Sequence, residues 1–534
     1  MRGILECLHH RSLVTIHHSQ DFPLSDKGKF QAIKGVRDIL PPESALWNRV
    51  EQTAREVFGT FGFAEIRLPI IEETELFARS VGIETDIVSK EMYSFSDNPE
   101  FNPKPPTSVE ELRDVANQAW LVFREKRIRD SQPYQDKCAE LISIFDSLTL
   151  IVGAATPPEI DLNQQKAIIN KMVELIFFIA DLDLGTQLAL RPEATASVVR
   201  AYIEHGMQML PGNAKLYYMG PMFRRERPQK GRYRQFYQIG AEVLGSSDAP
   251  GIDAEVIEML MRLFERLKLK GAILNVNSIG CKTCRPAYVE KLRAELLKVR
   301  EQLGEDSKRR IETNPLRVLD SKLEHEQAII EKLPRIAEHL CNDCHVHYDE
   351  VKRQLGLRGI TFQENWRLVR GLDYYMRTTF EITAPGLGSQ NAVCGGGRYD
   401  GLVELLGGPA TTKGIGFAIG TDRLILSLQE SGEGATPSGF DVYLAWFGAA
   451  AQSAAIGLAR RLRDAGFIVE LPAAEMKFGK SLGLADRLKA RHAVILGDDE
   501  LAAGIVTVKR LADGSQQKLA EPELFSYLRS GHQA

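Results

Sequence analysis

Hydrophobic positions spaced along one helical face predict a first helix over residues 45–58. Its apolar residues are Leu46, Val50, Ala54 and Val57. Two prolines directly before this segment fit the start of a helix. A short strand is expected at 64–68, and the sequence KEMYSF from Lys90 is typical of another strand. The ordered part of the chain therefore begins with both helix and strand.

A helical pattern interrupts this arrangement over residues 98–181. After a proline-rich opening, helices are expected at roughly 108–130, 134–152 and 163–180. The strand-like sequences MYSF and TQLAL on either side would pair as a hairpin if this segment were removed. We therefore interpret 98–181 as a helical insert, and its pattern indicates no function.

Strict alternation marks a strand in the middle of the chain. Tyr237, Ile239, Ala241 and Val243 form its apolar face. Gln238, Gly240 and Glu242 point to the opposite face. An amide and a carboxylate on a sheltered face are costly unless something pairs with them, and a small polar ligand would do so.

After residue 440, strand-like and helix-like segments alternate, which predicts a small α/β domain with a mostly parallel sheet. Because 534 residues exceed what one hydrophobic core holds, we expect several domains. The predicted parts are a disordered extension (1–29), a core domain (30–97, 182–278 and 360–428), the helical insert (98–181), a charged helix-rich insertion (279–359), a linker (429–439) and the α/β domain (440–534).

Overall charge is nearly balanced, with 67 basic and 71 acidic residues, so any contact with nucleic acid must come from a local basic patch. No apolar run approaches the roughly 20 residues that span a bilayer, and we expect a soluble protein. The histidines among the first 30 residues could bind a metal, although a disordered extension or a misplaced start is the simpler interpretation. Four of the seven cysteines lie in two C-x-x-C pairs, which favours a reducing compartment, the cytoplasm.

The segment before the alternating strand carries six cations in one turn, opposed within it only by Glu226. These cations are Arg224, Arg225, Arg227, Lys230, Arg232 and Arg234. The positive charges of such a loop repel one another unless a polyanion binds there. Triphosphates and nucleic-acid backbones are the common polyanions. A solvated hairpin with a basic tip is the alternative.

Two glycine-spaced segments could approach a ligand closely. In GIGFAIGTDRL, Thr421 can cap a helix with Arg423 in its first turn, and the glycines would let a flat ligand reach the backbone. In CGGGRYDGLV, three glycines precede a helix, with Arg398 and Asp400 directly behind. Ordinary tight turns have the same appearance.

The sequence RGLDYY combines a cation with two aromatic hydroxyls. Arg370 can stabilise growing negative charge, and the hydroxyls of Tyr374 and Tyr375 can recognise a nitrogen heterocycle. The alternative is a pair of core tyrosines beside a surface ion pair.

The cysteine pairs are Cys281-x-x-Cys284 and Cys341-x-x-Cys344. Four thiolates at this local spacing suit tetrahedral zinc if the pairs meet in space. Their separation is longer than in most zinc ribbons, and four reduced cysteines in a helical domain remain the alternative.

Taken together, these motifs resemble the histidyl-tRNA synthetases, which are class II aminoacyl-tRNA synthetases, from Phe30 to Leu528 apart from the insert. FRRERPQKGRYRQFYQ is similar to motif 2, GFAIGTDRL to motif 3 and residues 68–77 to a weaker motif 1. RGLDYY and CGGGRYDGL resemble the histidine-specific signatures. Ala194 stands where the family usually has glycine, and Thr421-Asp422 where Leu-Glu is common.

The resemblance implies an α+β catalytic domain with a mostly antiparallel sheet, helical insertions and a C-terminal α/β anticodon-binding domain. It implies activation of L-histidine by ATP with Mg²⁺, transfer to histidine tRNA, and a homodimer built through motif 1. Arg224 and Arg423 would grip ATP, and Arg370 would stabilise the transition state.

The family motifs also imply where histidine and tRNA bind. The histidine-binding set would be Glu193, Thr195, Gln238, Glu242, Tyr374 and Tyr375. Gln229 resembles the position that inspects the extra nucleotide of histidine tRNA. Backbone contacts in the last domain would come from Lys477, Lys480, Arg487, Lys489 and Arg491, unless these form a solvated face.

Two rival functions remain: a catalytically silent relative such as the regulatory subunit of ATP phosphoribosyltransferase, and a pure tRNA-binding or sensor module. The silent relatives lack the anticodon domain and the histidine signatures, and both are present here.

Overall fold

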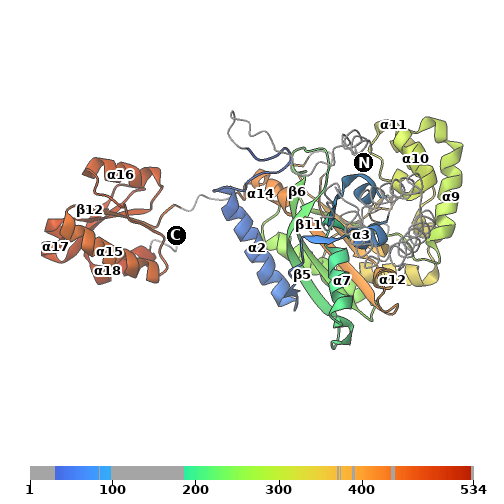
Figure 1. Ribbon diagram of the computed structural model, residues 1–534, viewed down its shortest axis with the longest axis horizontal. Coiled ribbons are helices and arrows are strands. Elements are labelled where there is room, and N and C mark those ends of the chain that lie inside the picture. The colour runs from blue at the N-terminus through green and yellow to red at the C-terminus, as the bar shows by residue number, and fades with distance from the viewer. Residues whose placement is uncertain are drawn as a thin grey trace, which may run out of the picture. The chain divides into compact units, whose positions relative to one another are not determined.

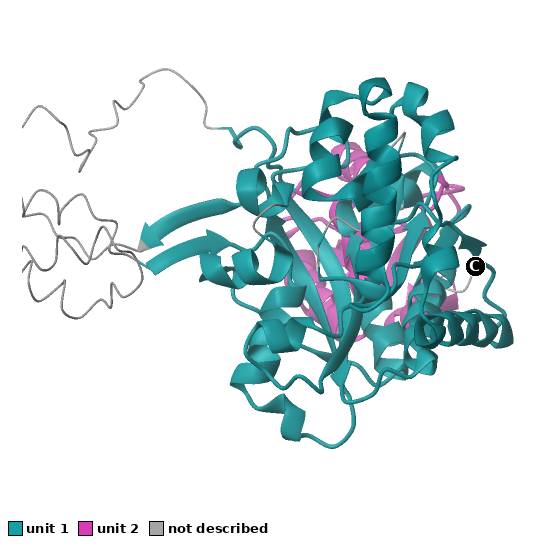
Figure 2. Ribbon diagram, turned by 90° about the vertical axis from the view of Figure 1, so that its right-hand side faces the viewer, with its two compact units in different colours: residues 1–38, 53–430 teal, residues 39–52, 431–534 magenta. Residues whose placement is uncertain are grey.

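The computed structural model describes residues 31–82, 85–97, 186–369, 372, 374–387, 391–434 and 439–530. The predicted N-terminal extension, the helical insert at 98–181 and Arg370 lie outside these described residues. The chain divides into two compact units, residues 1–38 with 53–430 and residues 39–52 with 431–534, coloured separately in Figure 2.

An eight-stranded sheet forms the centre of the first unit, in the order β1-β5-β6-β11-β10-β9-β7-β8 (Figure 1). Its strands are β1 (Ala64–Glu65), β5 (Ala214–Phe223), β6 (Gln235–Gly245), β11 (Lys413–Gly420), β10 (Ala392–Arg398), β9 (Met376–Thr383), β7 (Ile273–Ser278) and β8 (Gln363–Glu364). All neighbouring pairs are antiparallel except β1–β5 and β7–β8 at the two edges. The predicted mostly antiparallel sheet is confirmed.

The apolar face of this sheet packs against helix α8 (Pro250–Arg266) and against the last turn of α2 (Glu43–Thr60). Phe58 of α2 contacts the ring of Phe417 edge-on, with centroids 6.0 Å apart, and also that of Tyr217. Helix α8 buries Leu260, Leu263 and Phe264. Because side chains alternate along β6, this packing leaves Gln238 and Glu242 on the opposite face.

A separate three-stranded sheet carries the two flanks of the insert. β3 (Tyr93–Asp97) and β2 (Ile71–Glu73) both pair antiparallel with β4 (Thr186–Leu190). The hairpin-like pairing predicted for these flanks is confirmed, since Tyr93 lies opposite Leu190. The strand predicted from Lys90 begins later, because Ile87–Glu91 forms a π-helical turn.

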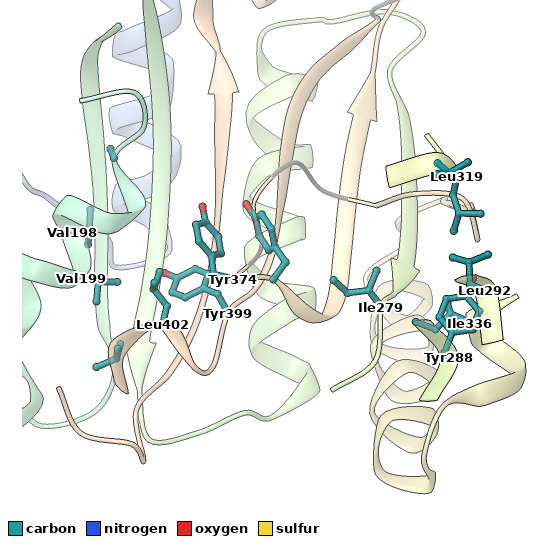
Figure 3. Packing of buried hydrophobic residues seen from close by; sticks show 14 of the residues in the cluster. Val198, Val199, Ile279, Tyr288, Leu292, Leu319, Ile336, Tyr374, Tyr399 and Leu402 are labelled. Atoms are coloured by element: carbon teal, nitrogen blue, oxygen red, sulfur yellow. The ribbon is translucent and has the colours of Figure 1, made fainter. Parts of the chain in front are cut away.

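Helices between residues 285 and 357 form the charged region that the sequence predicted. They are α9 (Arg285–Lys298), α10 (Glu305–Thr313), α11 (Glu324–Ile330) and α12 (Asn342–Leu357). The buried residues of α9, α10 and α11 join one hydrophobic cluster with helix α7 (Thr195–Glu204) and the central sheet. Figure 3 shows this cluster running from Val198 through Tyr374 and Ile279 to Leu292 and Leu319.

The glycine run of CGGGRYDGL was predicted as a loop that enters a helix, and this is wrong. Gly395, Gly396 and Gly397 lie within β10, and helix α13 (Leu402–Leu405) begins only later. A Cβ on Gly396 would lie 2.5 Å from Cζ of Phe380, and one on Gly397 would lie 2.6 Å from the oxygen of Thr378. These glycines serve close strand packing rather than ligand approach.

The second unit holds a five-stranded sheet in the order β13-β12-β14-β15-β16. Its strands are β12 (Val442–Trp446), β13 (Val469–Glu470), β14 (His492–Leu496), β15 (Ile505–Arg510) and β16 (Gln516–Ala520). Its helices are α15 (Ala449–Asp464), α16 (Phe478–Arg487), α17 (Asp498–Ala503) and α18 (Glu521–Ser530). Alternate residues of β12 enter two separate hydrophobic clusters, so this strand is buried on both faces.

The sheet of the second unit is mixed, which corrects the prediction of a mostly parallel one. β12 is parallel to β13 and β14, whereas β14–β15 and β15–β16 are antiparallel. Only the short helix α17 connects β14 to β15, and a parallel crossover needs a dozen or more residues.

Candidate active site

Glu242 lies at the centre of a buried polar cluster on the polar face of the central sheet. Its side chain is 1% exposed, and its two oxygens accept hydrogen bonds from Oγ1 of Thr195 at 2.7 Å and from the hydroxyl of Tyr399 at 2.6 Å. Burial raises the pKa of Glu242 to about 8 against the opposing effect of these two hydrogen bonds, and the nearby Glu193 adds to the rise. Burial of Glu242 thus favours its protonated form near neutral pH.

Glu193 lies at the start of helix α7, next to Glu242. Its carboxylate accepts the backbone N–H groups of Thr195 at 2.8 Å and of Ala196 at 3.0 Å. Burial raises its pKa, while these backbone bonds and the charge of Arg224 lower it. The turn that ends β4 thus brings a second carboxylate to the same place.

Four tyrosines surround the two carboxylates. The rings of Tyr374 and Tyr375 are 4.7 Å apart, and that of Tyr374 meets Tyr399 edge-on at 5.8 Å. Burial, followed by the neighbouring acidic groups, raises the pKa of Tyr218 and Tyr374 well above the usual range. The hydroxyl of Tyr218 is buried and has no hydrogen-bond partner among the described residues.

Tyr218 and Tyr399 were missed as candidates from the sequence, although glycines opposite them gave a signal. Tyr218 pairs with Gly240 across the sheet, and a Cβ on Gly240 would overlap with the Tyr218 ring. A Cβ on Gly414 would overlap with the ring of Tyr399. Glycines that interrupt alternating strands thus mark where large neighbouring side chains cross the sheet.

Gly414 and Gly416 were predicted to let a flat ligand approach the backbone, and the structure assigns them another purpose. Their space holds the ring of Tyr399 and the carboxylate of Glu242, respectively.

The helix cap predicted at Thr421 is also wrong. β11 runs directly into α14 (Thr421–Glu430), so Thr421 is the first helical residue. Its buried Oγ1 finds no hydrogen-bond partner within the described part of the chain.

Two arginines, Arg224 and Arg423, lie near the end of β6 that is farther from Glu242. Arg224 donates from Nε to the oxygen of Pro192 at 2.9 Å and stacks over Phe236 at 5.2 Å. Arg423 donates to the oxygens of Gly231 and Ala392. Burial lowers the pKa of Arg423, and the positive charges of Arg232 and Arg224 lower it further.

The polar cluster and the cations belong to one site. Phe236, Gln238 and Glu242 occupy alternate positions on one face of β6, so Gln238 lies between the two groups along the strand. The Oε1 of Gln238 is buried without a hydrogen-bond partner among the described residues. Of the predicted residues, Glu193, Thr195, Gln238, Glu242, Tyr374, Tyr375, Arg224 and Arg423 come together here.

The six cations of the basic segment divide between different contacts. Glu226 pairs with Arg232, Lys230 approaches Glu430 at 3.5 Å, and Arg225 stacks over Tyr93 at 5.6 Å. Gln229 is exposed at the turn, where its backbone pairs with that of Arg232. The segment therefore presents part of its charge to the site and part of it elsewhere.

Arg398 takes no part in this site. It is 1% exposed and pairs with Asp253 of α8 and, at 2.9 Å, with Asp400. Its position in β10 places it on the apolar face, away from Glu242. This arginine links β10 of the central sheet to helix α8 through an ion pair.

The four paired cysteines meet in a second cluster, apart from the carboxylates. Sγ of Cys281 lies 3.8 Å from those of Cys284 and Cys341, and Sγ of Cys284 lies 3.9 Å from that of Cys344. Among the described residues, these four form the group of ligand atoms close enough to hold a metal ion. The spatial meeting that zinc binding requires is present.

Two family models match this chain. Residues 156–424 match the model described as "Histidyl-tRNA synthetase", and residues 441–531 match "Anticodon binding domain". Within the described part of the chain, none of the helices combines the length and hydropathy needed to cross a bilayer.

Curated relatives and solved structures resemble the chain over most of its length. A histidine–tRNA ligase of Solibacter usitatus is 44% identical over 93% of this chain and 98% of its own, and one of Koribacter versatilis is 44% identical over 94% and 96%. The crystal structure of apo S. aureus histidyl-tRNA synthetase matches with a TM-score of 0.65 at 30% identity, covering 94% of this chain and 100% of that one.

Another solved structure shares the fold at lower identity. It is titled as an ATP phosphoribosyltransferase regulatory subunit/histidyl-tRNA synthetase from Bacillus halodurans C. It matches with a TM-score of 0.52 at 17% identity and covers 88% of this chain and 99% of that one.

Proposed function

This chain belongs to the histidyl-tRNA synthetase family, and on that premise we propose that it activates L-histidine with ATP and transfers it to histidine tRNA. It is an ATP-dependent aminoacyl-tRNA ligase by its relatives. The observation that carries the proposal is the buried Glu242, bonded to Thr195 and Tyr399 on the sheet face that also carries Arg224.

Histidine binds at the polar cluster. Glu193 and Thr195, with Gln238, hold the α-ammonium group, which needs acceptors. Glu242, Tyr374 and Tyr375 read the imidazole, whose two nitrogens offer a donor and an acceptor. Among the described residues, the Tyr218 hydroxyl and Gln238 Oε1 are buried without partners, and this supports the role because buried polar atoms normally find partners.

ATP binds beside the cations. An oxygen of the histidine carboxylate attacks the α-phosphorus, the bond to the bridging oxygen breaks, and pyrophosphate leaves with that oxygen. Charge grows on the phosphoryl oxygens, and cations already held in place stabilise it. Arg224 and Arg423 supply such charge from fixed positions. Arg370, by its place in the family motif RGLDYY, stabilises the transition state as well. Mg²⁺ bound to the phosphates would neutralise part of their charge.

The transfer step requires tRNA at two places. A hydroxyl of the terminal ribose attacks the acyl carbon of histidyl-adenylate. The bond from this carbon to the bridging oxygen breaks, and AMP leaves with that oxygen. Gln229, exposed at the turn of the basic segment, faces the acceptor end. The C-terminal domain binds the anticodon region through exposed cations, Lys477, Lys480, Arg487, Lys489 and Arg491.

The remaining assignments follow the family. The core comprises 30–97, 182–278 and 360–428, the second domain 440–534, and the chain acts as a cytoplasmic homodimer. The cysteine cluster holds a structural zinc ion that stays outside the chemistry.

The test is exchange of labelled pyrophosphate into ATP by the full-length chain. We expect exchange that depends on histidine, followed by charging of histidine tRNA. Exchange without amino acid, or with another amino acid preferred, would overturn the specificity. Binding of tRNA without any exchange would favour a silent relative or a tRNA sensor.

A further inference from the structure

The spacing of the four cysteine sulfurs matches a metal site. A tetrahedral zinc ion with Zn–S bonds of about 2.3 Å separates its sulfurs by about 3.8 Å. Three sulfur–sulfur separations in the cluster are 3.8, 3.8 and 3.9 Å, and all four sulfurs lie within 4.8 Å of one another. A bonded disulfide would bring two sulfurs to about 2 Å, and these cysteines are free.

We propose that Cys281, Cys284, Cys341 and Cys344 bind one Zn²⁺ ion, which fixes the segment 374–377 that forms one wall of the histidine site. The metal part of this proposal stands on the geometry of the cysteine cluster and does not depend on the proposed function. The positioning part rests on the proposed function, because it concerns histidine binding.

The backbone around the first cysteine pair forms a turn that directs N–H groups at the two sulfurs. The N–H of Cys281 donates to Sγ of Cys284 at 3.3 Å, and the N–H of Thr283 donates to Sγ of Cys281 at 3.4 Å. Such bonds orient thiolates and stabilise their charge. Gly280 has φ +68°, and a Cβ there would lie 2.8 Å from Sγ of Cys284. The turn therefore requires glycine.

The second pair comes from a helix that is anchored elsewhere. Cys344 is buried in the first turn of α12, which packs on α8. His345 and His347 are not ligands, since His345 pairs with Asp349 at 2.8 Å and His347 contacts the oxygen of Asp248 at 3.1 Å. Four cysteines with no open position make a closed structural site, not a catalytic one.

The residues that flank the first cysteine pair contact the tyrosine segment. Arg377 donates its backbone N–H to the oxygen of Gly280 at 2.8 Å and accepts that of Ile279 at 2.9 Å. Arg285, next to Cys284, donates from Nη1 to the oxygen of Tyr375 at 2.5 Å. A metal that fixes the cysteine turn therefore also fixes the backbone that carries Tyr374 and Tyr375.

The metal is tested on the full-length chain purified without chelator. Elemental analysis should find close to one zinc per chain, and exchange with Co²⁺ should give the visible spectrum of tetrahedral thiolate coordination. Cys341→Ser should lower the zinc content. Iron in place of zinc, or no metal in a folded and active protein, would overturn the proposal. This readout does not depend on activity, so it separates failure of the metal from failure of the function.

The positioning role is tested with Arg285→Ala, and Lys298→Ala on the same helix is the exposed basic control. Arg285→Ala should keep its zinc and raise KM for histidine about tenfold, with KM for ATP unchanged. Lys298→Ala should match the wild type. An unchanged histidine KM in a zinc-loaded Arg285→Ala protein would refute the positioning role.

Discussion

The carboxylate of Glu242 occupies the space that a side chain on Gly416 would fill. The two residues lie directly opposite each other on β6 and β11, and a Cβ on Gly416 would overlap with Oε2 of Glu242. The glycine therefore makes room for a buried acid, and the acid can reach both Thr195 and Tyr399.

Gly416→Ala should displace Glu242 and impair both stability and histidine binding. Overpacking of a tight interior typically costs about 1–3 kcal/mol. We expect a lower melting temperature and a histidine KM raised at least tenfold in pyrophosphate exchange. Gly59→Ala is the control, since a Cβ there meets no atom within 4 Å. Equal behaviour of the two variants would contradict this account of Gly416.

Glu242→Gln should change how stability depends on pH. The folded-state pKa of Glu242 is about 8 and its ordinary value is 4.5, so between these pH values the folded protein keeps a proton that the unfolded chain releases. The contribution of this group to the free energy of unfolding therefore falls as pH rises through that window, on the order of a few kcal/mol.

The measurement is the melting temperature of Glu242→Gln minus that of the wild type, at pH 5 and pH 8. This difference should be more positive at pH 8, because glutamine has no proton to lose. Glu193, whose pKa burial also raises, is present in both proteins, so the effect of its own burial is common to both. A difference independent of pH would show that Glu242 titrates normally.

Tyr399→Phe removes one of the two hydrogen bonds to Glu242 while keeping the ring. The loss of a buried hydrogen bond costs about 1–2 kcal/mol, so kcat/KM for histidine should fall roughly tenfold with little change in KM for ATP. Tyr443→Phe is the matched control. Its buried hydroxyl bonds to Ser481 at 3.1 Å in the C-terminal unit. A fall of the same size in both variants would argue against a local effect.

Arg224→Ala removes a cation from the proposed phosphate site. Deleting one fixed stabilising group typically lowers kcat by about 10²–10³-fold, and we expect that loss in histidine-dependent exchange. The control is Arg225→Ala, because this neighbouring arginine is exposed and stacks on Tyr93. Near-normal exchange by Arg224→Ala would remove it from the site.

Much of the site was predictable from residue types and spacing. The alternation through Gln238 and Glu242 predicted two polar groups on one sheet face, and the structure has both there. The flanks of the insert pair as expected. The roles of these residues stay predictions, and Arg370 lies outside the described residues.

The errors have two physical origins. From sequence alone, a glycine can indicate a tight turn, close approach of a ligand or space for a neighbouring side chain. The glycines at 395–397, 414 and 416 are equally compatible with all three. In the second unit, the length of the connection rather than the strand pattern decided that β14 and β15 are antiparallel.

The sequence by itself determined the periodicities, the charges and the local cysteine spacing, because these depend on neighbours along the chain. Only the tertiary structure decided that Tyr218 and Tyr399 fill the space over Gly240 and Gly414, and that the two cysteine pairs meet. Those outcomes depend on which distant segments become neighbours, and the packing of the whole core selects them.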